Sequence, residues 1–322
     1  MRYRHRLAIL VTDGPNPLTT RRCAHTVPPN GFAVQGEIMR FWRACIAFLA
    51  TAVFGSVGHA ATIFNFQNFN DCSQLQLNGN AACTGGVLRV TPANFNQAGS
   101  AFSTTLIPLG AGATFSTFFT FRFTTPGGSS DSDGLGADGI VFVIQPVSST
   151  VGAVGGGIGY QGIPNSLGVE FDTWNNGVPL DQDGNHVGVD LNGSVASVAA
   201  VAIPARINNG ATWFAWIDYD GTTLTLRLSQ TSTRPAAPTL SQVVNLASVL
   251  GTTQAFVGFT SGTGAAFENH DVLTWRFDNA FAPIGVAARS AAVPTLDDAG
   301  LVLLALLLLA ASLGRKRSER GT

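Results

Sequence analysis

The sequence predicts an all-β domain in which two sheets pack face to face, and three observations support this. Apolar residues in the middle of the chain occur as short alternating runs, glycine is abundant at 37 residues, and no part of this region has the pattern of a long amphipathic helix. Alternation with period two is typical of strands with one buried face, and glycine supplies the tight turns between strands. About 230 residues are enough for one sandwich with a sizeable core.

Two runs show the alternation clearly. In residues 115–124 four of the phenylalanines share one face, and in residues 223–228 three leucines alternate with Thr and Arg. Asp220-Gly221 separates the second run from the segment TWFAWIDY, which predicts a hairpin. Further strands are expected around residues 63–69, 86–91, 139–147, 166–174, 186–191, 255–260 and 271–278.

The charges are distributed unevenly along the chain. The whole sequence has a net charge of −1, but residues 61–292 contain seven Arg, no Lys and fourteen Asp or Glu, which is a net charge of −7. An acidic surface repels the phosphates of a nucleic-acid backbone. Nucleic acid is therefore not an expected partner.

The segment that begins at Met39 has the three-part layout of a secretory signal. Two arginines are followed by an apolar stretch over 44–53 and then by small residues up to Ala60. We predict a signal peptide at 39–60 that is cleaved after Ala60, and a short buried helix is the alternative. Residues 1–38 are rich in Arg and Pro and show no periodicity, so we interpret them as an extension upstream of the true start.

The last part of the chain, residues 286–322, has the order of a C-terminal sorting signal. A linker leads to a VPTL motif at 293–296, an apolar stretch at 299–313 and a basic end at 315–320. The apolar stretch is shorter than the ~20 residues of most membrane-spanning helices, and the basic end marks the cytoplasmic side. These parts resemble the IPTL-type sorting signals of Gram-negative bacteria, relatives of the PEP-CTERM signals. The resemblance implies export to the envelope, with a short transmembrane helix in the inner membrane until a peptidase releases the protein at the cell surface.

The cysteines predict a disulfide. Of the four in the chain, only Cys72 and Cys83 lie beyond the predicted signal, and an exported protein meets an oxidising compartment. The segment between them contains Asn78-Gly79, which predicts a turn. We therefore expect a disulfide that closes an exposed hairpin, since two thiols are too few for a zinc site.

Acidic and imidazole side chains concentrate in residues 170–186. Glu170 and Asp172 point to one face of a predicted strand, about 7 Å apart, and the loop after them supplies Asn176, Asp181, Asp183 and His186. Carboxylates at this density repel one another unless a cation lies among them. Oxygen ligands suit Ca²⁺, and an imidazole suits a transition ion such as Mn²⁺. A solvated acidic turn is the alternative.

This region resembles the metal loop of the legume and L-type lectins. The family motif E-x-D-x-aromatic-x-N, followed by Asp, His and V-G-V-D, is matched at Glu170, Asp172, Trp174, Asn176, Asp181, His186 and 187–190. By this resemblance Asp172 and Asp181 bridge two ions, and Asn176 completes the Ca²⁺ site with the backbone carbonyl of Trp174. Glu170 and His186 complete the transition-metal site. Asp183 matches no family ligand and is interpreted as a turn residue.

Three further segments match the family in order. They are Ala137-Asp138-Gly139 before a predicted strand, the glycine loop at 155–159 and the closing strand at 270–275. The resemblance implies that Asp138 follows a cis peptide bond and accepts hydrogen bonds from sugar hydroxyls, while the backbone N–H of Gly156 meets the sugar. It covers about residues 63–279 and implies a concanavalin-like jelly-roll sandwich at 61–285.

The expected function is metal-dependent carbohydrate binding without enzymatic activity, with Ca²⁺ and a transition ion such as Mn²⁺ as cofactors and glycans as partners. Asn176 and Trp174 join Asp138 and Gly156 in the predicted carbohydrate site, because an aromatic ring near Asp138 can stack on an apolar sugar face. The preferred sugar and the oligomeric state do not follow from the sequence. Gly157 stands where the family often has an aromatic residue, and the loop at 261–269 lacks a residue that fixes a monosaccharide.

Three other functions are possible. A glycoside hydrolase of the E-x-D-x-x-E type needs a second Glu at position 175, where Asn175 stands, and hydrolysis needs a carboxylate pair. A Ser-His-Asp hydrolase is disfavoured because the sequence has no G-x-S-x-G motif, and we expect His270 to be a structural hydrogen-bonding residue. The other alternative is a structural surface or biofilm-matrix protein that has kept the fold without binding.

Overall fold

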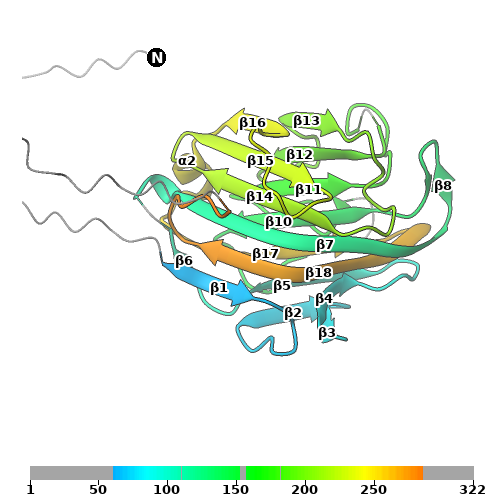
Figure 1. Ribbon diagram of the computed structural model, residues 1–322, viewed down its shortest axis with the longest axis horizontal. Helices are drawn as coiled ribbons and strands as arrows, with labels where there is room; N and C mark the ends of the chain where they lie inside the picture. The colour runs from blue at the N-terminus through cyan, green and yellow to red at the C-terminus, as the bar shows by residue number, and fades with distance from the viewer. Residues whose placement is uncertain (1–60, 110, 153–156, 182, 286–322) are drawn as a thin grey trace, which may run out of the picture. The chain divides into compact units, whose positions relative to one another are not determined.

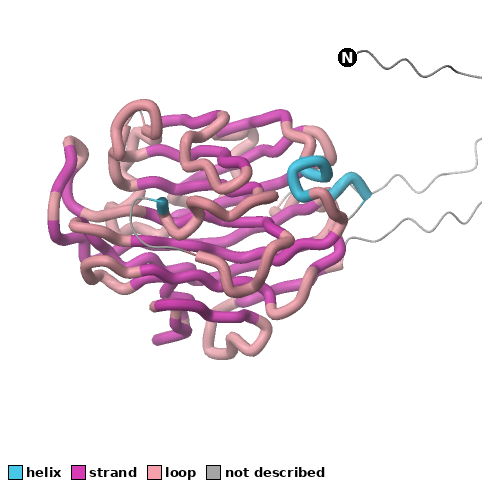
Figure 2. Tube along the Cα trace, turned by 180° about the vertical axis from the view of Figure 1, so that it is seen from behind, coloured by secondary structure: helices cyan, strands magenta, loops and turns pink. Residues whose placement is uncertain are grey.

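The computed structural model describes residues 61–285 apart from 110, 153–156 and 182, and these residues form a two-layered β-sandwich (Figure 1). Strands dominate both layers, and helix occurs only in short segments of the described chain (Figure 2). These include the 3-10 turn η1 (Ala111–Ala113) and the helix α2 (Leu246–Leu250). The strand pairs are antiparallel. The prediction of an all-β domain with two sheets is confirmed.

One layer, here called sheet I, has eight strands in the described part of the chain. In spatial order they are β16 (Leu240–Val243), β15 (Thr223–Ser229), β14 (Trp213–Tyr219), β7 (Phe115–Gly128), β18 (Ala266–Asp278), β4 (Val87–Thr91) and β3 (Ala82–Thr84), and β1 (Thr62–Phe66) also pairs with β18. The long strands β7 and β18 lie side by side at the centre of this layer (Figure 1). The first strand of the domain therefore lies beside its last.

The other layer, sheet II, also has eight strands among the residues described. In spatial order they are β13 (Ala199–Ala202), β12 (His186–Leu191), β11 (Leu167–Asp172), β10 (Gly139–Gln145), β17 (Gln254–Gly262), β5 (Ala98–Ser103) and β2 (Leu75–Gly79), and β6 (Ile107–Pro108) also pairs with β17. A small separate hairpin is formed by β8 (Ser130–Asp131) and β9 (Gly134–Leu135). The order β12-β11-β10 places His186 of β12 beside the strand that carries Glu170 and Asp172, with the start of β10 on the other side of that strand.

Aromatic side chains fill the space between the sheets. The four phenylalanines predicted to share a face of β7 are fully buried, as are the core-facing leucines Leu224 and Leu226 of β15. Phe119 packs edge-to-face against Phe171 of β11 and Phe259 of β17, with ring centroids 5.6 and 5.0 Å apart. Full burial of such a side chain stabilises a fold by about 1.5–3 kcal/mol. The alternation in these strands therefore identifies the core face correctly.

The predicted hairpin at Asp220-Gly221 joins β14 to β15. One carboxylate oxygen of Asp220 accepts hydrogen bonds from the backbone N–H groups of Thr222 and Thr223, both at 2.8 Å. Gly221 has a φ of +102°, a conformation that side chains disfavour. This turn chemistry confirms the prediction.

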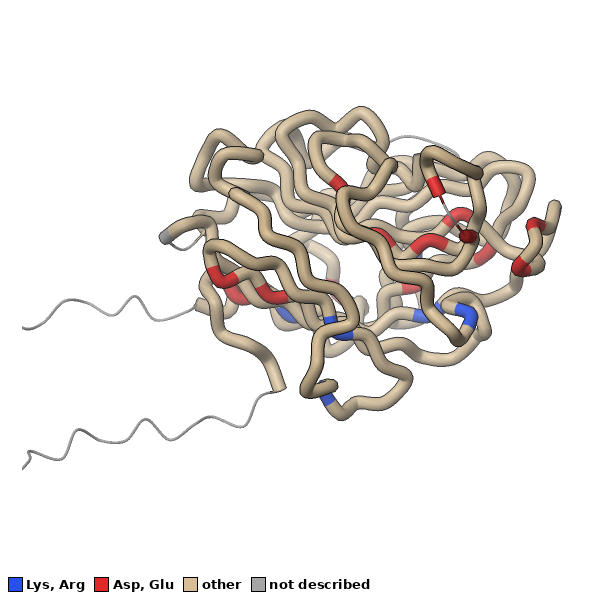
Figure 3. The backbone as a smooth tube through the Cα atoms, turned by 90° about the horizontal axis from the view of Figure 1, so that it is seen from above, with Lys and Arg blue, Asp and Glu red and all other residues tan. Residues whose placement is uncertain are grey.

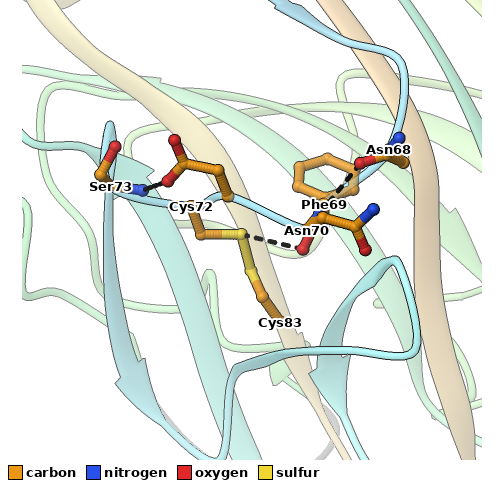
Figure 4. The surroundings of a disulfide bond; sticks show 7 residues. Asn68, Phe69, Asn70, Cys72, Ser73 and Cys83 are labelled. Atoms are coloured by element: carbon orange, nitrogen blue, oxygen red, sulfur yellow. Dashed lines mark hydrogen bonds between the residues drawn. A yellow bond between two sulfur atoms is a disulfide. The ribbon is translucent and has the colours of Figure 1, made fainter.

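The predicted disulfide between Cys72 and Cys83 is present, with the two Cα atoms 6.6 Å apart (Figure 4). The predicted hairpin between these cysteines is wrong, however, because β2 pairs with β5 in sheet II whereas β3 pairs with β4 in sheet I. At Asn78-Gly79 the chain turns across the edge of the sandwich, and the N–H of Asn80 donates to the carbonyl of Ala98. The disulfide therefore connects the segment that leads into β2 of sheet II to β3 of sheet I.

Three of the sequence predictions concern the two ends of the chain. The predicted extension at 1–38, the signal peptide at 39–60 and the sorting tail at 286–322 lie outside the described residues. Within the part of the chain that the structure describes, no helix is sufficiently long and apolar to traverse a bilayer.

Candidate metal and carbohydrate site

The predicted metal ligands begin on β11, where side chains alternate between the core and the outer face of sheet II. Val169 and Phe171 belong to the core between the sheets. Glu170 and Asp172 therefore point to the opposite, outer face. Both are buried, with exposed fractions of 1% and 2%.

His186 joins these acids from the neighbouring strand. It opens β12 directly opposite Asp172 in the antiparallel register, and its Nε2 lies 3.2 Å from Oε1 of Glu170. Ligand atoms of these three residues all lie within 4.8 Å of one another. The fold thus brings together three of the residues that the sequence predicts as metal ligands.

The imidazole of His186 is oriented from its other nitrogen. Nδ1 lies 3.1 Å from the backbone carbonyl of Asp183, and a carbonyl can only accept, so Nδ1 carries a proton. A histidine held from Nδ1 in this way can present a deprotonated Nε2 to a metal ion, an arrangement typical of metal-binding histidines. The carboxylate of Asp183 accepts the N–H of Asn185 at 2.9 Å. Asp183 is a turn residue, as predicted, and its carbonyl also orients the histidine.

Burial and mutual repulsion raise the pKa values of several of these groups. Burial, followed by the charges of Glu170 and Asp181, raises the pKa of Asp172 well above its usual range. Burial also raises the pKa of Asp181. For His186 burial acts to lower the pKa, but the hydrogen bond and charge of Glu170, with further acids, outweigh it and raise the pKa. The cluster therefore holds more negative charge than its protein surroundings compensate.

A second pair of residues, Asp190 and Ser197, lies next to Glu170. The Ser197 hydroxyl lies 2.5 Å from Glu170 Oε1 and 2.7 Å from Asp190 Oδ1. A hydroxyl donates one proton, so it cannot satisfy both carboxylates at once. Burial and the charge of Glu170 raise the pKa of Asp190 well above its usual range. Sequence reasoning missed both residues, although Asp190 shares a strand face with His186 through the i, i+4 spacing.

The loop after β11 closes over this cluster. Asp172 Oδ1 accepts the N–H of Trp174 at 2.6 Å, and Asp181 Oδ2 accepts the N–H of Asn176 at 2.6 Å. The side chain of Trp174 is partly exposed and that of Asn176 is exposed, whereas Asp181 is buried. Asp181 is therefore buried in this loop but is not one of the three residues whose ligand atoms lie within 4.8 Å of one another, and Asn176 lies at the surface.

Asp138 lies at the start of β10, beside the end of β11. The Ala137–Asp138 peptide bond is cis, as the family resemblance implies. The Asp138 N–H donates to the carbonyl of Gly262 at 3.2 Å, and its carbonyl accepts the N–H of Thr173 at 3.0 Å. Its side chain is 4% exposed. Burial, with the charges of Glu268 and Asp181, raises the pKa of Asp138 to about 7.

A ring of hydrogen bonds fixes the residue after Asp138. The Gly139 N–H donates to His270 Nε2 at 3.1 Å, and His270 Nδ1 lies 2.7 Å from the Thr91 hydroxyl. That hydroxyl lies 2.7 Å from the hydroxyl of Ser261, which donates to the Gly139 carbonyl at 2.7 Å. All these contacts are satisfied when His270 is neutral with its proton on Nδ1. The predicted structural role of His270 is confirmed.

Glu268 is a buried acid that sequence reasoning missed. Its Oε1 accepts the Thr173 hydroxyl at 2.8 Å and lies 3.4 Å from His270 Nε2. The residue is fully buried. It therefore links the closing strand β18 to the loop that follows Asp172. The only signal in the sequence was its place in the loop at 261–269.

The predicted glycine loop is described only in part, because Gly156 lies outside the described residues. Just beyond it, Ile158 and Tyr160 pack with Val141 and Val143 in a small apolar cluster on the outer face of sheet II. The Ile158 carbonyl accepts the Thr260 hydroxyl at 2.9 Å. These contacts anchor the end of the glycine loop over β10. Figure 3 shows many of the acidic residues gathered in one half of the domain.

Comparison with known proteins adds a family to this geometry. The chain matches the family model of the legume lectin domain over residues 61–290 and that of the IPTL-CTERM motif over residues 291–317. The L-type lectin-domain containing receptor kinase VIII.1 of Arabidopsis thaliana is 32% identical over 250 residues, which is 70% of this chain and 33% of the kinase. The chain thus spans about a third of that relative. The lectin-like protein At3g16530 of Arabidopsis thaliana is 29% identical, covering 75% of this chain and 99% of that protein.

Solved structures give the same family. A lectin from Bauhinia forficata in complex with GalNAc has a TM-score of 0.58 at 25% identity, and basic winged bean lectin with Tn-antigen has 0.57 at 29%. Each match covers 68% of this chain and 98% of the lectin. These neighbours are lectins, in agreement with the predicted absence of enzymatic activity. The chain belongs to the legume lectin domain family and carries an IPTL-CTERM motif.

Proposed function

We propose that this protein is an exported lectin whose sugar binding depends on bound metal ions. The observation that carries the proposal is the convergence of Glu170, Asp172 and His186, with ligand atoms within 4.8 Å of one another in a buried setting. Oε2 of Glu170 is buried and has no hydrogen-bond partner in the described part of the protein. A buried carboxylate without a partner is costly. The donor set therefore fits a divalent cation.

The family resemblance suggests how the ligands divide between two ions. Asp172 and Asp181 would be shared, Glu170 and His186 would complete a transition-metal site of the Mn²⁺ type, and Asn176 with the Trp174 carbonyl would complete a Ca²⁺ site. Bound ions would supply the positive charge that the carboxylates lack. The protein contributes the strand register that sets Asp172 opposite His186 and the carbonyl of Asp183 that orients the imidazole.

The carbohydrate would bind beside this cluster, with Asp138, Gly156, Trp174 and Asn176 as its contacts. Oδ2 of Asp138 is buried and has no hydrogen-bond partner among the residues described, so this carboxylate has unused capacity to accept a hydrogen bond from a sugar hydroxyl. Trp174 and Asn176 reach the surface of the neighbouring loop. Together they offer an acceptor, an aromatic face and an amide, which is a combination typical of sugar sites.

The IPTL-CTERM motif supports a route of export. We propose that residues 39–60 direct secretion and that the apolar stretch at 299–313 holds the protein in the inner membrane of a Gram-negative cell before a peptidase removes it. The sandwich would then meet glycans at the cell surface or outside the cell. The disulfide between Cys72 and Cys83 agrees with an oxidising compartment.

A glycan array tests the binding function. The purified protein, loaded with Ca²⁺ and Mn²⁺, should bind a subset of glycans and should lose this binding in EDTA. GalNAc and galactose belong in the panel because similar lectins were solved with them. Absence of binding by metal-loaded protein would favour the structural alternative. Release of product from labelled β-glucans would instead indicate a hydrolase.

A further inference from the structure

The β8–β9 hairpin carries two acids that have no place in the predicted ligand set. Asp131 and Asp133 belong to the segment DSDG, and the hairpin leads directly into Asp138. Asp131 Oδ2 accepts the N–H of Asn175 at 2.9 Å, and Asp133 Oδ2 accepts the N–H of Gly184 at 3.1 Å. The two carboxylates thus contact the loop at residues 173–185, here called the metal loop, near both of its ends.

The hairpin itself is fixed from both sides. Oδ1 of Asp131 accepts the N–H groups of Asp133 and Gly134, at 2.9 and 3.1 Å, and so closes the turn. At the exit of the hairpin the Leu135 carbonyl accepts the side chains of Asn208 and Arg206, at 3.0 and 3.2 Å. The acids therefore act from a braced support rather than from a free loop.

The contact also requires a glycine on the metal loop. A Cβ atom at Gly184 would lie 2.3 Å from Asp131 Oδ2, 2.9 Å from Asp133 Oδ2 and 3.1 Å from the backbone nitrogen of Asn175. A side chain at this position would require the two carboxylates to move away from the loop. The absence of a Cβ lets the two acids approach the loop backbone directly.

We propose that Asp131 and Asp133 are positioning residues that hold the metal loop, residues 173–185, in its binding conformation before metal arrives. The loop carries Asp181 and Asn176, and its acids repel one another when no cation is bound. Hydrogen bonds from an independent hairpin oppose that repulsion and lower the cost of ordering the loop on binding. This inference rests on the proposed metal binding. By this inference the β8–β9 hairpin, which leads into Asp138, also positions the metal loop.

Variants of Asp133 test the idea because its role involves one acceptor oxygen. In Asp133→Ala the Gly184 N–H loses its acceptor, and the Kd for Ca²⁺ should rise about tenfold or more, the range seen for outer partners of metal sites. Asp133→Asn keeps an acceptor oxygen while removing the charge, and it should lose much less Ca²⁺ affinity than Asp133→Ala. Asp220→Ala is the matched control, since the Asp220 carboxylate also accepts backbone N–H groups, but at the β14–β15 turn outside the metal loop.

Two further measurements separate positioning from general destabilisation. Gly184→Ala retains every acid of the chain but would displace the carboxylates of Asp131 and Asp133 from the loop backbone, so it should weaken Ca²⁺ binding as Asp133→Ala does. In metal-free protein, hydrogen exchange at Gly184 should accelerate in Asp133→Ala while the core strands keep their protection. Equal Ca²⁺ binding by Asp133→Ala and wild type would overturn the inference, as would equal losses in the Ala and Asn variants. Wild-type protein that binds neither Ca²⁺ nor Mn²⁺ would overturn the proposed function itself.

Discussion

The substitution Asp138→Asn should separate sugar binding from metal binding and from stability. Asn has nearly the same volume as Asp and keeps one acceptor oxygen, but it cannot carry the negative charge. The backbone contacts of Asp138 with Gly262 and Thr173 do not involve its side chain. Hydrogen bonds to a charged acceptor are worth about 1.5–3 kcal/mol each. Losing the equivalent of one such hydrogen bond should weaken sugar binding about tenfold or more.

The same change should stabilise the metal-free protein at high pH. Burial, with Glu268 and Asp181, raises the pKa of Asp138 from 3.8 to about 7. The folded state therefore holds this proton more tightly than the unfolded state, and the free energy of unfolding falls as pH rises between these values. Above the folded pKa the penalty is complete, and a shift of about three units corresponds to at most about 4 kcal/mol.

Thermal unfolding in EDTA measures this effect. Asp138→Asn should melt several degrees above wild type at about pH 8, because about 1 kcal/mol moves the melting temperature of a domain this size by about 2–4 °C. At about pH 3 the two proteins should melt at similar temperatures, since wild-type Asp138 is then mostly protonated in both states. Asp220→Asn, at an exposed turn, is the control and should show no stabilisation at high pH.

Binding measurements complete the test. Elemental analysis should find the same bound Ca²⁺ and Mn²⁺ in Asp138→Asn and in wild type, because Asp138 is not a ligand in the proposed arrangement. Calorimetry with a sugar identified on the array should show the loss of affinity. Unchanged sugar affinity would remove Asp138 from the carbohydrate site, and parallel loss of metal would make it part of the metal site.

The remaining predictions concern the bridging acid, the disulfide and the N-terminus. Asp181→Ala removes a shared ligand and the acceptor of the Asn176 N–H, so bound metal, melting temperature in Ca²⁺ and sugar binding should fall together; metal retained at the wild-type level would contradict this. Reducing the disulfide between Cys72 and Cys83, which are 11 residues apart, should cost about 3 kcal/mol of unfolding free energy in urea titrations, and free thiols in exported material would refute it. Intact mass of the exported protein should place its first residue near Ala61, with translation from Met39; recovery of any part of 1–38 would argue otherwise.

Local patterns predicted the parts of the fold in which one strand face is uniformly apolar. The phenylalanines of β7 and the leucines of β15 lie in the core because alternation alone specifies which face is buried. The acids of β11 were equally predictable, since Glu170 and Asp172 alternate with core residues on one strand. Their meeting with His186 depends on a single antiparallel register, which the family resemblance anticipated.

Strands without such contrast were missed. β5 consists mostly of small residues, and β13 is an edge strand of Ala and Val with exposed positions, so neither has a clear apolar face. The segment between Cys72 and Cys83 resembled a hairpin because Asn-Gly is a strong turn signal. Strands β2 and β3 instead pair with β5 and β4, which belong to different sheets. This pairing depends on strands outside the segment and cannot be recognised from the segment alone.

The contacts around Asp138 explain why separate short motifs identify one family. β17 supplies the Gly262 carbonyl and Ser261, the metal loop supplies Thr173, β18 supplies His270, and β4 supplies Thr91. Two of the motif segments, the metal loop and the closing strand, therefore give fixed contacts to the junction formed by the third, although these segments are far apart in sequence. Any one of them is weakly informative alone because its partner is absent from the local pattern. Their fixed order along the chain reflects a site that exists only when both sheets are assembled, so sugar binding should be lost wherever that assembly is disturbed.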